Sequence, residues 1–170
     1  MDKIIATIDQ HDIDPTAQTS QRSTYRVRTA VRAVMADQDG RIALMYAGKK
    51  KYYKLPGGGV DEGEDLDIAL ERELIEETGS KAKVTEDLGQ VIEWRDYATL
   101  HQLSYAYRAS LIGEPGMPDF TQHEIDEGFE MRWADSLDQA ITLIDANTSS
   151  DDLDVRFMSL RDAAILRSAK

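Results

Sequence analysis

The chain has 170 residues, of which 41% are hydrophobic and 31% charged, a balance typical of one folded domain rather than of a disordered segment. It has no cysteine, which excludes disulfides, thiolate catalysis and sulfur-ligated zinc. The formal net charge of −12 predicts no binding to a nucleic-acid polymer, because such binding depends on cationic side chains that neutralise phosphates. A small phosphorylated ligand that is held through a metal ion is compatible with this charge.

The N-terminal segment is expected to be an extension of the main domain. Residues 1–23 contain IIATI, which predicts a short strand, followed by the polar and turn-rich DPTAQTSQRST. The segment turns acidic too early for a secretory signal, and no stretch of the chain approaches the roughly 18 apolar residues of a membrane span. We therefore expect a cytoplasmic protein that does not enter a membrane, with its main domain at residues 24–170.

The first elements of the main domain are predicted to be strands. YRVRTAVRAVM alternates between two faces, with Val31 and Met35 on one face and Arg28 and Arg32 on the other. DQDG then favours a hairpin turn into RIALMYA, a second strand. KKKYYKLP predicts a third strand, which ends at a proline followed by three glycines.

A helix is predicted at residues 65–78, with Gly79 as its stop. Its apolar residues fall in two stripes on nearly opposite faces, which predicts that the helix is covered on two sides. The stripes consist of Leu66, Leu70 and Leu74 on one face and of Ile68 and Ile75 on the other.

The second half of the chain predicts further strands and two helices. VTEDLGQVIEWRDY and HQLSYAYRASL are predicted strands, GEPGMPDFTQHE a long loop, and EGFEMRWA a further strand. SLDQAITLIDA, with Ser136 as candidate N-cap, and VRFMSLRDAAILRSA are predicted helices. This order of elements predicts a mixed α/β domain with helices packed on a sheet.

The predicted helix at 65–78 carries crowded carboxylates. Glu73, Glu76 and Glu77 are neighbours at i,i+3 and i,i+4, where like charges repel, and Glu77 lies beside the leucine stripe. Three oxygen donors so close together suit a hard cation such as Mg²⁺. The alternative is a solvated acidic face, with Arg72 paired to Glu76. The preceding PGGG favours a site, because glycines let the backbone approach a ligand closely.

These residues carry a resemblance to a known family. The Nudix hydrolases share the pattern G-x5-E-x7-R-E-U-x-E-E-x-G-U, in which U is a bulky apolar residue. In this chain the pattern is matched, in register, by Gly58, Glu64, Arg72, Glu73, Leu74, Glu76, Glu77 and Gly79. Only Ser80, at the last U, departs from it, at a position that packs the loop after the helix.

The resemblance covers the chain from about Tyr25 to the C-terminus. It implies an α+β fold of the Nudix type, an α/β/α sandwich in which a mixed central β-sheet carries the box helix on one side and the C-terminal helices. Residues 24–170 would then be a Nudix hydrolase domain. Members of the family often dimerise, so the N-terminal extension is also a candidate for a strand exchanged in a homodimer.

The same resemblance implies a metal-dependent active site with Mg²⁺, or alternatively Mn²⁺. The implied metal ligands are Gly57 through its carbonyl, Glu64, Glu73, Glu76 and Glu77. Arg72 would orient the glutamates, and Glu73 is also the candidate general base. An acidic residue beyond the box would complete the catalytic set, with Glu127 as the candidate and Glu124 as the alternative; both are equally compatible with loop surface.

Other residues have weaker predictions. Arg26, Arg28 and Arg32 share a strand face that is predicted to be solvated. The alternatives are that these arginines hold substrate phosphates or balance the glutamates. Several aromatic residues are predicted to pack in the core, with stacking on the nucleobase of a substrate as the alternative. These are Tyr52, Tyr53, Trp94, Tyr97 and Phe120. The short basic run of Lys49, Lys50 and Lys51 is predicted to be solvated, with phosphate steering as the alternative.

Within the family, we expect a MutT-like enzyme that converts a nucleoside or deoxynucleoside triphosphate into a nucleoside monophosphate and pyrophosphate. The alternatives are a dinucleoside polyphosphate or ADP-sugar pyrophosphatase, and a nucleotide sensor without turnover. The region beyond the box lacks the proline that ADP-ribose hydrolases often carry there, and instead has Tyr97, a weak indication of dinucleoside polyphosphates. A complete set of acidic box positions favours an enzyme over a sensor.

Overall fold

The computed structural model describes residues 3–19 and 21–170; residues 1, 2 and 20 of the predicted N-terminal extension lie outside it. The strands are β1 (Ile4–Asp9), β2 (Arg26–Ala36), β3 (Ile42–Ala47), β4 (Tyr52–Lys54), β5 (Lys81–Arg95), β6 (Leu100–Ile112) and β7 (Phe129–Ala134). The helices are α1 (Gln10–Ile13), α2 (Leu66–Thr78), α3 (Gln122–Glu127), α4 (Leu137–Asp145) and α5 (Leu153–Ser168), with short 3₁₀ turns at Arg22–Thr24 and Asp96–Ala98.

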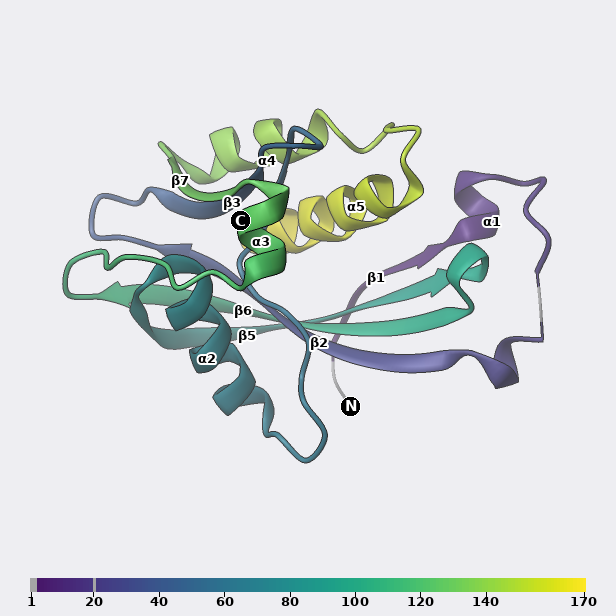
Figure 1. The fold of residues 1–170 in the computed structure, drawn as a ribbon, viewed down its shortest axis with the longest axis horizontal. Helices are drawn as coiled ribbons and strands as arrows, with labels where there is room; N and C mark the ends of the chain where they lie inside the picture. The colour runs from purple at the N-terminus through teal and green to yellow at the C-terminus, as the bar shows by residue number, and fades with distance from the viewer. Residues whose placement is uncertain (1–2, 20) are drawn as a thin grey trace.

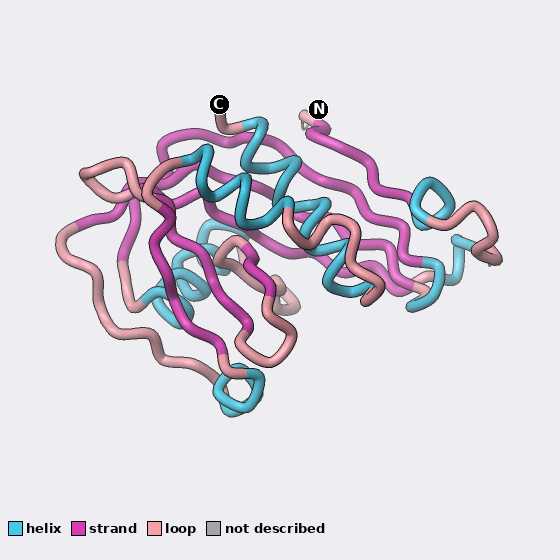
Figure 2. The backbone as a smooth tube through the Cα atoms, turned by 90° about the horizontal axis from the view of Figure 1, so that it is seen from above, coloured by secondary structure: helices cyan, strands magenta, loops and turns pink. Residues whose placement is uncertain are grey.

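The described strands form one mixed sheet in the order β1-β5-β6-β2-β3-β4, and β7 also pairs with β3. β2 runs parallel to β6, β1 runs parallel to β5, and the remaining pairs are antiparallel. Figure 1 shows α2 on one side of this sheet and α4 and α5 on the other, and Figure 2 shows the long strands from above. The predicted α+β sandwich with a mixed sheet is therefore confirmed.

The two faces of β2 supply two separate cores, as its alternation predicts. Val31, Ala33 and Met35 pack against Leu70 and Leu74 of α2. The opposite face, with Val34, belongs to a larger core that is closed by α4 and α5. Burial of a large aliphatic side chain stabilises a fold by about 1.5–3 kcal/mol, so these contacts hold α2 and α5 firmly against opposite faces of β2.

The prediction that α2 is covered on two sides is wrong. The leucine stripe contacts the sheet, but Ile68 is 58% exposed and Ile75 39% exposed. The sheet lies against one face of the helix only. Periodicity identifies an apolar stripe but not whether another element is close enough to cover it.

The loop predicted at residues 113–124 extends too far along the chain, because its last residues belong to the helix α3. Thr121 caps α3: its side chain accepts from the Glu124 amide, and the Glu124 carboxylate accepts from the Thr121 amide at 2.8 Å. This reciprocal arrangement is a capping box, for which T-x-x-E is the sequence signature. Proline and glycine earlier in the segment concealed that signal.

The strand expected at IIATI is present as β1, which pairs with β5 of the same chain. Arg22 ties the rest of the extension to the domain, because its guanidinium contacts Asp9 at 2.7 Å and Asp96 at 3.2 Å. In the described part of the chain, no helix is long and apolar enough to span a membrane.

Candidate active site

The glycine loop lies across β2. The amide of Val31 donates to the carbonyl of Gly58, and the amide of Ala33 donates to the carbonyl of Pro56, both at 3.0 Å. Gly57 has φ +127°, and a Cβ there would overlap the carbonyl oxygen of Val31. Only glycine fits this conformation and this close approach, so the PGGG sequence sets the path of the loop.

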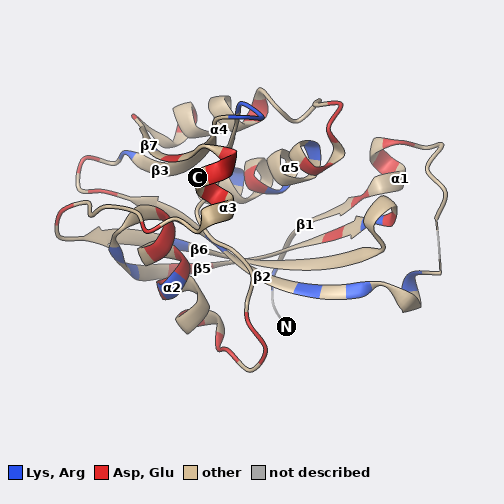
Figure 3. Cartoon of the chain, in the orientation of Figure 1, with Lys and Arg blue, Asp and Glu red and all other residues tan. Residues whose placement is uncertain are grey.

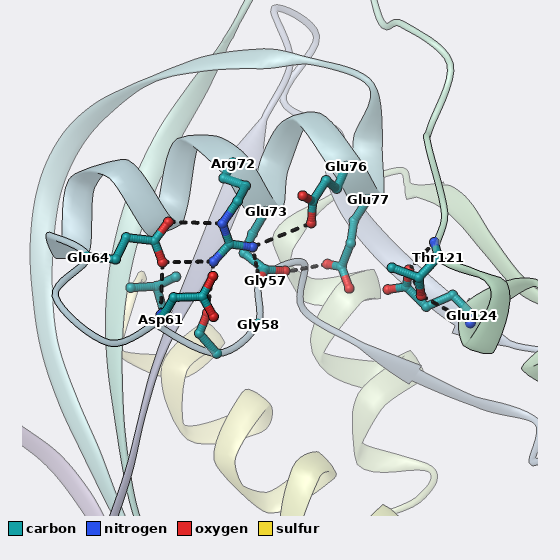
Figure 4. Close-up of polar contacts among 12 residues, drawn as sticks. Gly57, Gly58, Asp61, Glu64, Arg72, Glu73, Glu76, Glu77, Thr121 and Glu124 are labelled. Atoms are coloured by element: carbon teal, nitrogen blue, oxygen red, sulfur yellow. Dashed lines mark hydrogen bonds and ion pairs between the residues drawn. The ribbon is translucent and has the colours of Figure 1, made fainter.

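The loop meets the carboxylates of α2 directly. The amide of Gly57 donates to Oε2 of Glu77 at 2.6 Å, and a Cβ at Gly58 would overlap the carboxylate of Glu73. Figure 4 shows Glu73, Glu76 and Glu77 projecting from the helix toward the loop. The glycines and the acidic helix therefore form one site, as the order PGGG followed by an acidic helix predicts.

Arg72 lies at the centre of the box residues (Figure 4). Its guanidinium donates to both carboxylate oxygens of Glu64 at 2.9 Å, to Glu73 at 2.8 Å and, more weakly, to Glu76 at 3.4 Å. It also donates to the carbonyl of Gly59 at 3.0 Å. One arginine thus contacts three of the predicted ligands and the loop, which are the contacts that an orienting role requires.

These contacts make the stability of the protein depend on pH through Glu64. Hydrogen bonds from Arg72 lower the pKa of Glu64 from 4.5 to about 2. A carboxylate whose pKa is lower in the folded state stabilises that state above pH 4.5, and this contribution is lost as the pH falls toward 2. We expect Glu64→Gln to be less stable than the wild type near neutral pH, with a difference that shrinks as the pH falls through this window.

Urea unfolding of both proteins at a series of pH values measures this difference. Glu62→Gln is the matched control, since Glu62 lies two residues away and is exposed. The free energy of unfolding of Glu62→Gln should differ little from that of the wild type, and this difference should not change with pH. A Glu64→Gln difference that does not change with pH would contradict the role of the Arg72 contact.

Glu77 has a partner that sequence analysis missed. Only 2% of its side chain is exposed, and Lys54 donates to its Oε1 at 2.7 Å. Burial raises the pKa of Glu77, and the charge of Lys54 and the amide of Gly57 counter this effect. The cost of a carboxylate beside the leucine stripe is therefore offset by an ion pair. The sequence feature that could have indicated this pair is Lys54 itself, which ends the strand that leads into the PGGG loop.

The residues of this site fit a divalent cation by their chemistry. Glu73, Glu76 and Glu77 offer the carboxylate oxygens that Mg²⁺ and Mn²⁺ prefer, and they border one cavity together with Gly57. Arg72 and Lys54 now place positive charge against these oxygens. Within residues 3–19 and 21–170, no three acidic or histidine side chains are already arranged to hold a metal. A cation bound to these oxygens would share them with Lys54 and Arg72.

This cavity has a volume of about 410 Å³ and two walls of opposite charge. The acidic wall consists of Glu73, Glu76 and Glu77 on α2, which is rich in acidic residues in Figure 3. The same cavity is lined by a group that we call the basic floor, which consists of Arg28 and Arg32 from β2, Arg95 from β5 and Arg161 from α5. The rest of the lining consists of Lys54, Gly57, Gly58, Arg72, Gln102, Thr121, Glu124 and Met158.

The basic floor was only partly foreseen. Arg28 and Arg32, two of the three candidate strand arginines, line the cavity, whereas Arg26 lines a separate depression. Arg95 and Arg161 were not singled out by sequence analysis. They are distant from β2 in the sequence, and no local pattern indicates that β5 and α5 bring them to the same place.

Of the two acidic residues considered beyond the box, Glu124 lines the cavity. Glu127 lies in an adjoining cavity of about 330 Å³ and pairs with Lys49 at 3.6 Å. The geometry thus favours the alternative, Glu124, which shares a cavity with the box carboxylates, while the role of Glu127 stays a prediction.

The aromatic candidates do not border the 410 Å³ cavity in the part of the chain that the structure describes. Trp94 stacks on His101 with ring centroids 3.8 Å apart, and the hydroxyl of Tyr97 donates to Asp154. Tyr52 alone of the five lines the adjoining cavity, together with Phe129. Ser80, the departure from the box pattern, is buried and accepts a hydrogen bond from the Gly116 amide at 3.3 Å, so it still packs the loop after the helix.

Comparison with known proteins extends these observations. The model of the NUDIX domain matches residues 26–166. An RNA pyrophosphohydrolase of Caulobacter vibrioides is 33% identical over 136 residues, which cover 69% of this chain and 76% of that relative. A CMP-5'-(N-acetyl-N-hydroxy-3-aminopropyl)phosphonate hydrolase of Streptomyces rubellomurinus is 28% identical, with 84% of this chain and 68% of that relative covered.

Solved structures show the same fold. The MutT NUDIX hydrolase from Burkholderia pseudomallei is 28% identical, with a TM-score of 0.52, and the match covers 66% of this chain and 85% of that one. The E. coli ORF135 protein is 20% identical, with a TM-score of 0.58 over 89% of this chain and 98% of that one. The matched box, the fold and these relatives together show that the chain belongs to the NUDIX family and is a pyrophosphohydrolase.

Proposed function

We propose that this enzyme hydrolyses nucleoside or deoxynucleoside triphosphates, with Mg²⁺ as cofactor and Mn²⁺ as an alternative, to a nucleoside monophosphate and pyrophosphate. One observation carries the proposal: a single cavity joins carboxylates that suit a divalent cation to arginines that suit phosphate. A triphosphate bound to a cation presents both kinds of charge at once.

The residues are assigned as follows. Glu73, Glu76 and Glu77, with the Gly57 carbonyl and with Glu64 in support, would hold the cation. When bound, the cation neutralises phosphate charge and makes a water molecule easier to deprotonate.

The chain's own groups then position the reactants. Arg72 keeps Glu64 and Glu73 in place, and Glu73 accepts a proton from the attacking water. Glu124, which lines the cavity, is the further acidic residue that we favour over Glu127. The adjoining cavity, with Tyr52 and Phe129, offers apolar surface to the nucleoside.

A second candidate substrate is the triphosphorylated 5′ end of RNA, since several relatives are named RNA pyrophosphohydrolases. Its triphosphate would occupy the same cavity. The net charge of −12 favours the free nucleotide, because an RNA chain beyond the first nucleotides needs cationic surface. A cytoplasmic location and a homodimer stay proposals.

A panel of substrates tests the proposal. We expect nucleoside or deoxynucleoside triphosphates to release monophosphate and pyrophosphate, detected by ³¹P NMR, with Mg²⁺ and not with a chelator. The panel includes a 5′-triphosphorylated oligoribonucleotide, a dinucleoside polyphosphate and an ADP-sugar. A higher kcat/KM for any of these three than for every mononucleotide would overturn the assignment.

A further inference from the structure

Arg161 is an unusual residue at the bottom of the cavity. It is only 1% exposed, its Nε donates to Asp162 at 2.7 Å, and its Nη1 lies 3.9 Å from Glu93. Among the described residues, its Nη2 has no hydrogen-bond partner although it is buried. A buried donor without an acceptor is costly, and it lies in a side chain that lines the cavity.

The neighbouring arginines are also poorly balanced by carboxylates. In the described part of the chain, Arg28 and Arg32 form no ion pair. Arg28 donates to the neutral Gln102 at 2.8 Å, and Arg32 donates to the carbonyls of Val31 and Gly58. Burial lowers the pKa of Arg28, and it lowers the pKa of Arg32 to about 9. The positive charge of Arg161 is the second cause for both residues.

The charges of the basic floor do not cancel. Its four guanidiniums, those of Arg28, Arg32, Arg95 and Arg161, face two buried carboxylates, Glu93 and Asp162. Asp154 approaches Arg95 at 3.6 Å, but its side chain is 55% exposed. An excess of buried positive charge is unfavourable until an anion joins it. The charges of Glu73 and Glu77 on the acidic wall also act on Arg28 and Arg32, but in the described part of the chain these carboxylates form their ion pairs with Arg72 and Lys54 instead.

We propose that Arg28, Arg95 and Arg161 form a subsite for a third phosphate, the one that is not joined to the cleaved bond. The proposal rests on the proposed function and narrows it. Substrates would carry three consecutive phosphates, whereas a nucleoside diphosphate linked to an uncharged sugar would leave the floor unbalanced. Guanidinium groups suit this task, because their planar forks donate two hydrogen bonds to a phosphate.

The subsite can be tested with inorganic ions and without metal. Calorimetry with a chelator present would measure binding of tripolyphosphate and pyrophosphate to the wild type, to Arg28→Gln and to Arg161→Gln. We expect the wild type to bind tripolyphosphate more tightly than pyrophosphate, and both variants to weaken tripolyphosphate binding by about tenfold or more. Arg167→Gln is the matched control, since Arg167 is an exposed arginine of α5 that pairs with Asp145 outside the cavity, and it should bind as the wild type does.

Folding must be separated from binding. Arg161→Gln removes the buried ion pair with Asp162 and the longer contact with Glu93, although the Leu55 amide and Arg95 still contact these carboxylates, so its fold is checked by near-ultraviolet circular dichroism. Arg28→Gln removes no ion pair and keeps the test decisive if the first variant unfolds. Wild-type protein that binds no tripolyphosphate, or Arg28→Gln that binds it as tightly as the wild type, would overturn the subsite.

Steady-state kinetics distinguish failure of the proposed subsite from failure of the proposed function. Arg28→Gln should raise KM for a nucleoside triphosphate by about tenfold and raise KM for an ADP-sugar, which has no third phosphate, by much less. Triphosphate turnover with unchanged KM in this variant would reject the subsite alone. Tripolyphosphate binding that depends on Arg28, in an enzyme that turns over no triphosphate, would reject the proposed function and keep the subsite.

Discussion

Replacement of Glu77 by glutamine is expected to lower kcat/KM by roughly 10³-fold. Glu77 is the most buried of the box carboxylates and lines the cavity between the glycine loop and α2. A bound cation stabilises the charge of a phosphoryl transition state by several kcal/mol, and each 1.36 kcal/mol is about tenfold in rate. Glutamine keeps the shape of the side chain but removes the negative charge that holds the cation.

The measurement is steady-state hydrolysis over a range of Mg²⁺ concentrations, with Glu71→Gln as control. Glu71 lies on the same helix, is exposed and does not line the cavity, so its loss should leave turnover unchanged. If Glu77→Gln kept full turnover, the assignment of Glu77 as a metal ligand would be wrong.

The same variant should also lose stability. Repulsion among the carboxylates alone predicts that loss of one charge stabilises the helix slightly. The contact with Lys54 at 2.7 Å reverses this expectation, because the lysine, 13% exposed, would lose its partner. We expect a decrease of about 1–3 kcal/mol in the free energy of unfolding without metal, so activity should be compared well below the melting temperature.

Replacement of Gly57 by alanine should destabilise the fold by about 3 kcal/mol or more. Gly57 has φ +127°, and the added Cβ would overlap the backbone carbonyl of Val31 and lie 3.0 Å from Cα of Arg32. Backbone atoms of a central strand cannot move aside without breaking sheet hydrogen bonds, so the loop itself must shift. That shift would also displace the amide that binds Glu77, and activity should fall with stability.

Gly63→Ala is the matched control for this prediction. Gly63 has φ +79° but nothing within 4 Å of an added Cβ, so it incurs only the strain of a left-handed alanine, about 1–2 kcal/mol. Urea unfolding of the two variants and the wild type measures the difference. Equal destabilisation by both substitutions would show that crowding against Val31 contributes nothing.

Much of the fold was predictable from local patterns. The alternation from Arg26 to Met35, the helix that stops at Gly79 and the cap at Ser136 all appear in the structure. Each depends on neighbours within a few residues, where the period of apolar residues and the chemistry of caps act directly. The exposed stripe of Ile68 and Ile75 shows the limit of such patterns, because exposure depends on distant segments.

For the site, the sequence by itself determined the acidic helix, the glycine loop and their adjacency, because fixed spacing places Glu73, Glu76 and Glu77 on neighbouring turns. Only the tertiary structure decided which cations face them and what lies opposite. Lys54 meets Glu77 through the pairing of a short strand, and Arg161 joins Arg28 because α5 packs on the face of β2 opposite α2. Packing between elements far apart in the chain has no local signature, and it is this packing that makes the acidic helix one wall of a cavity with a basic floor.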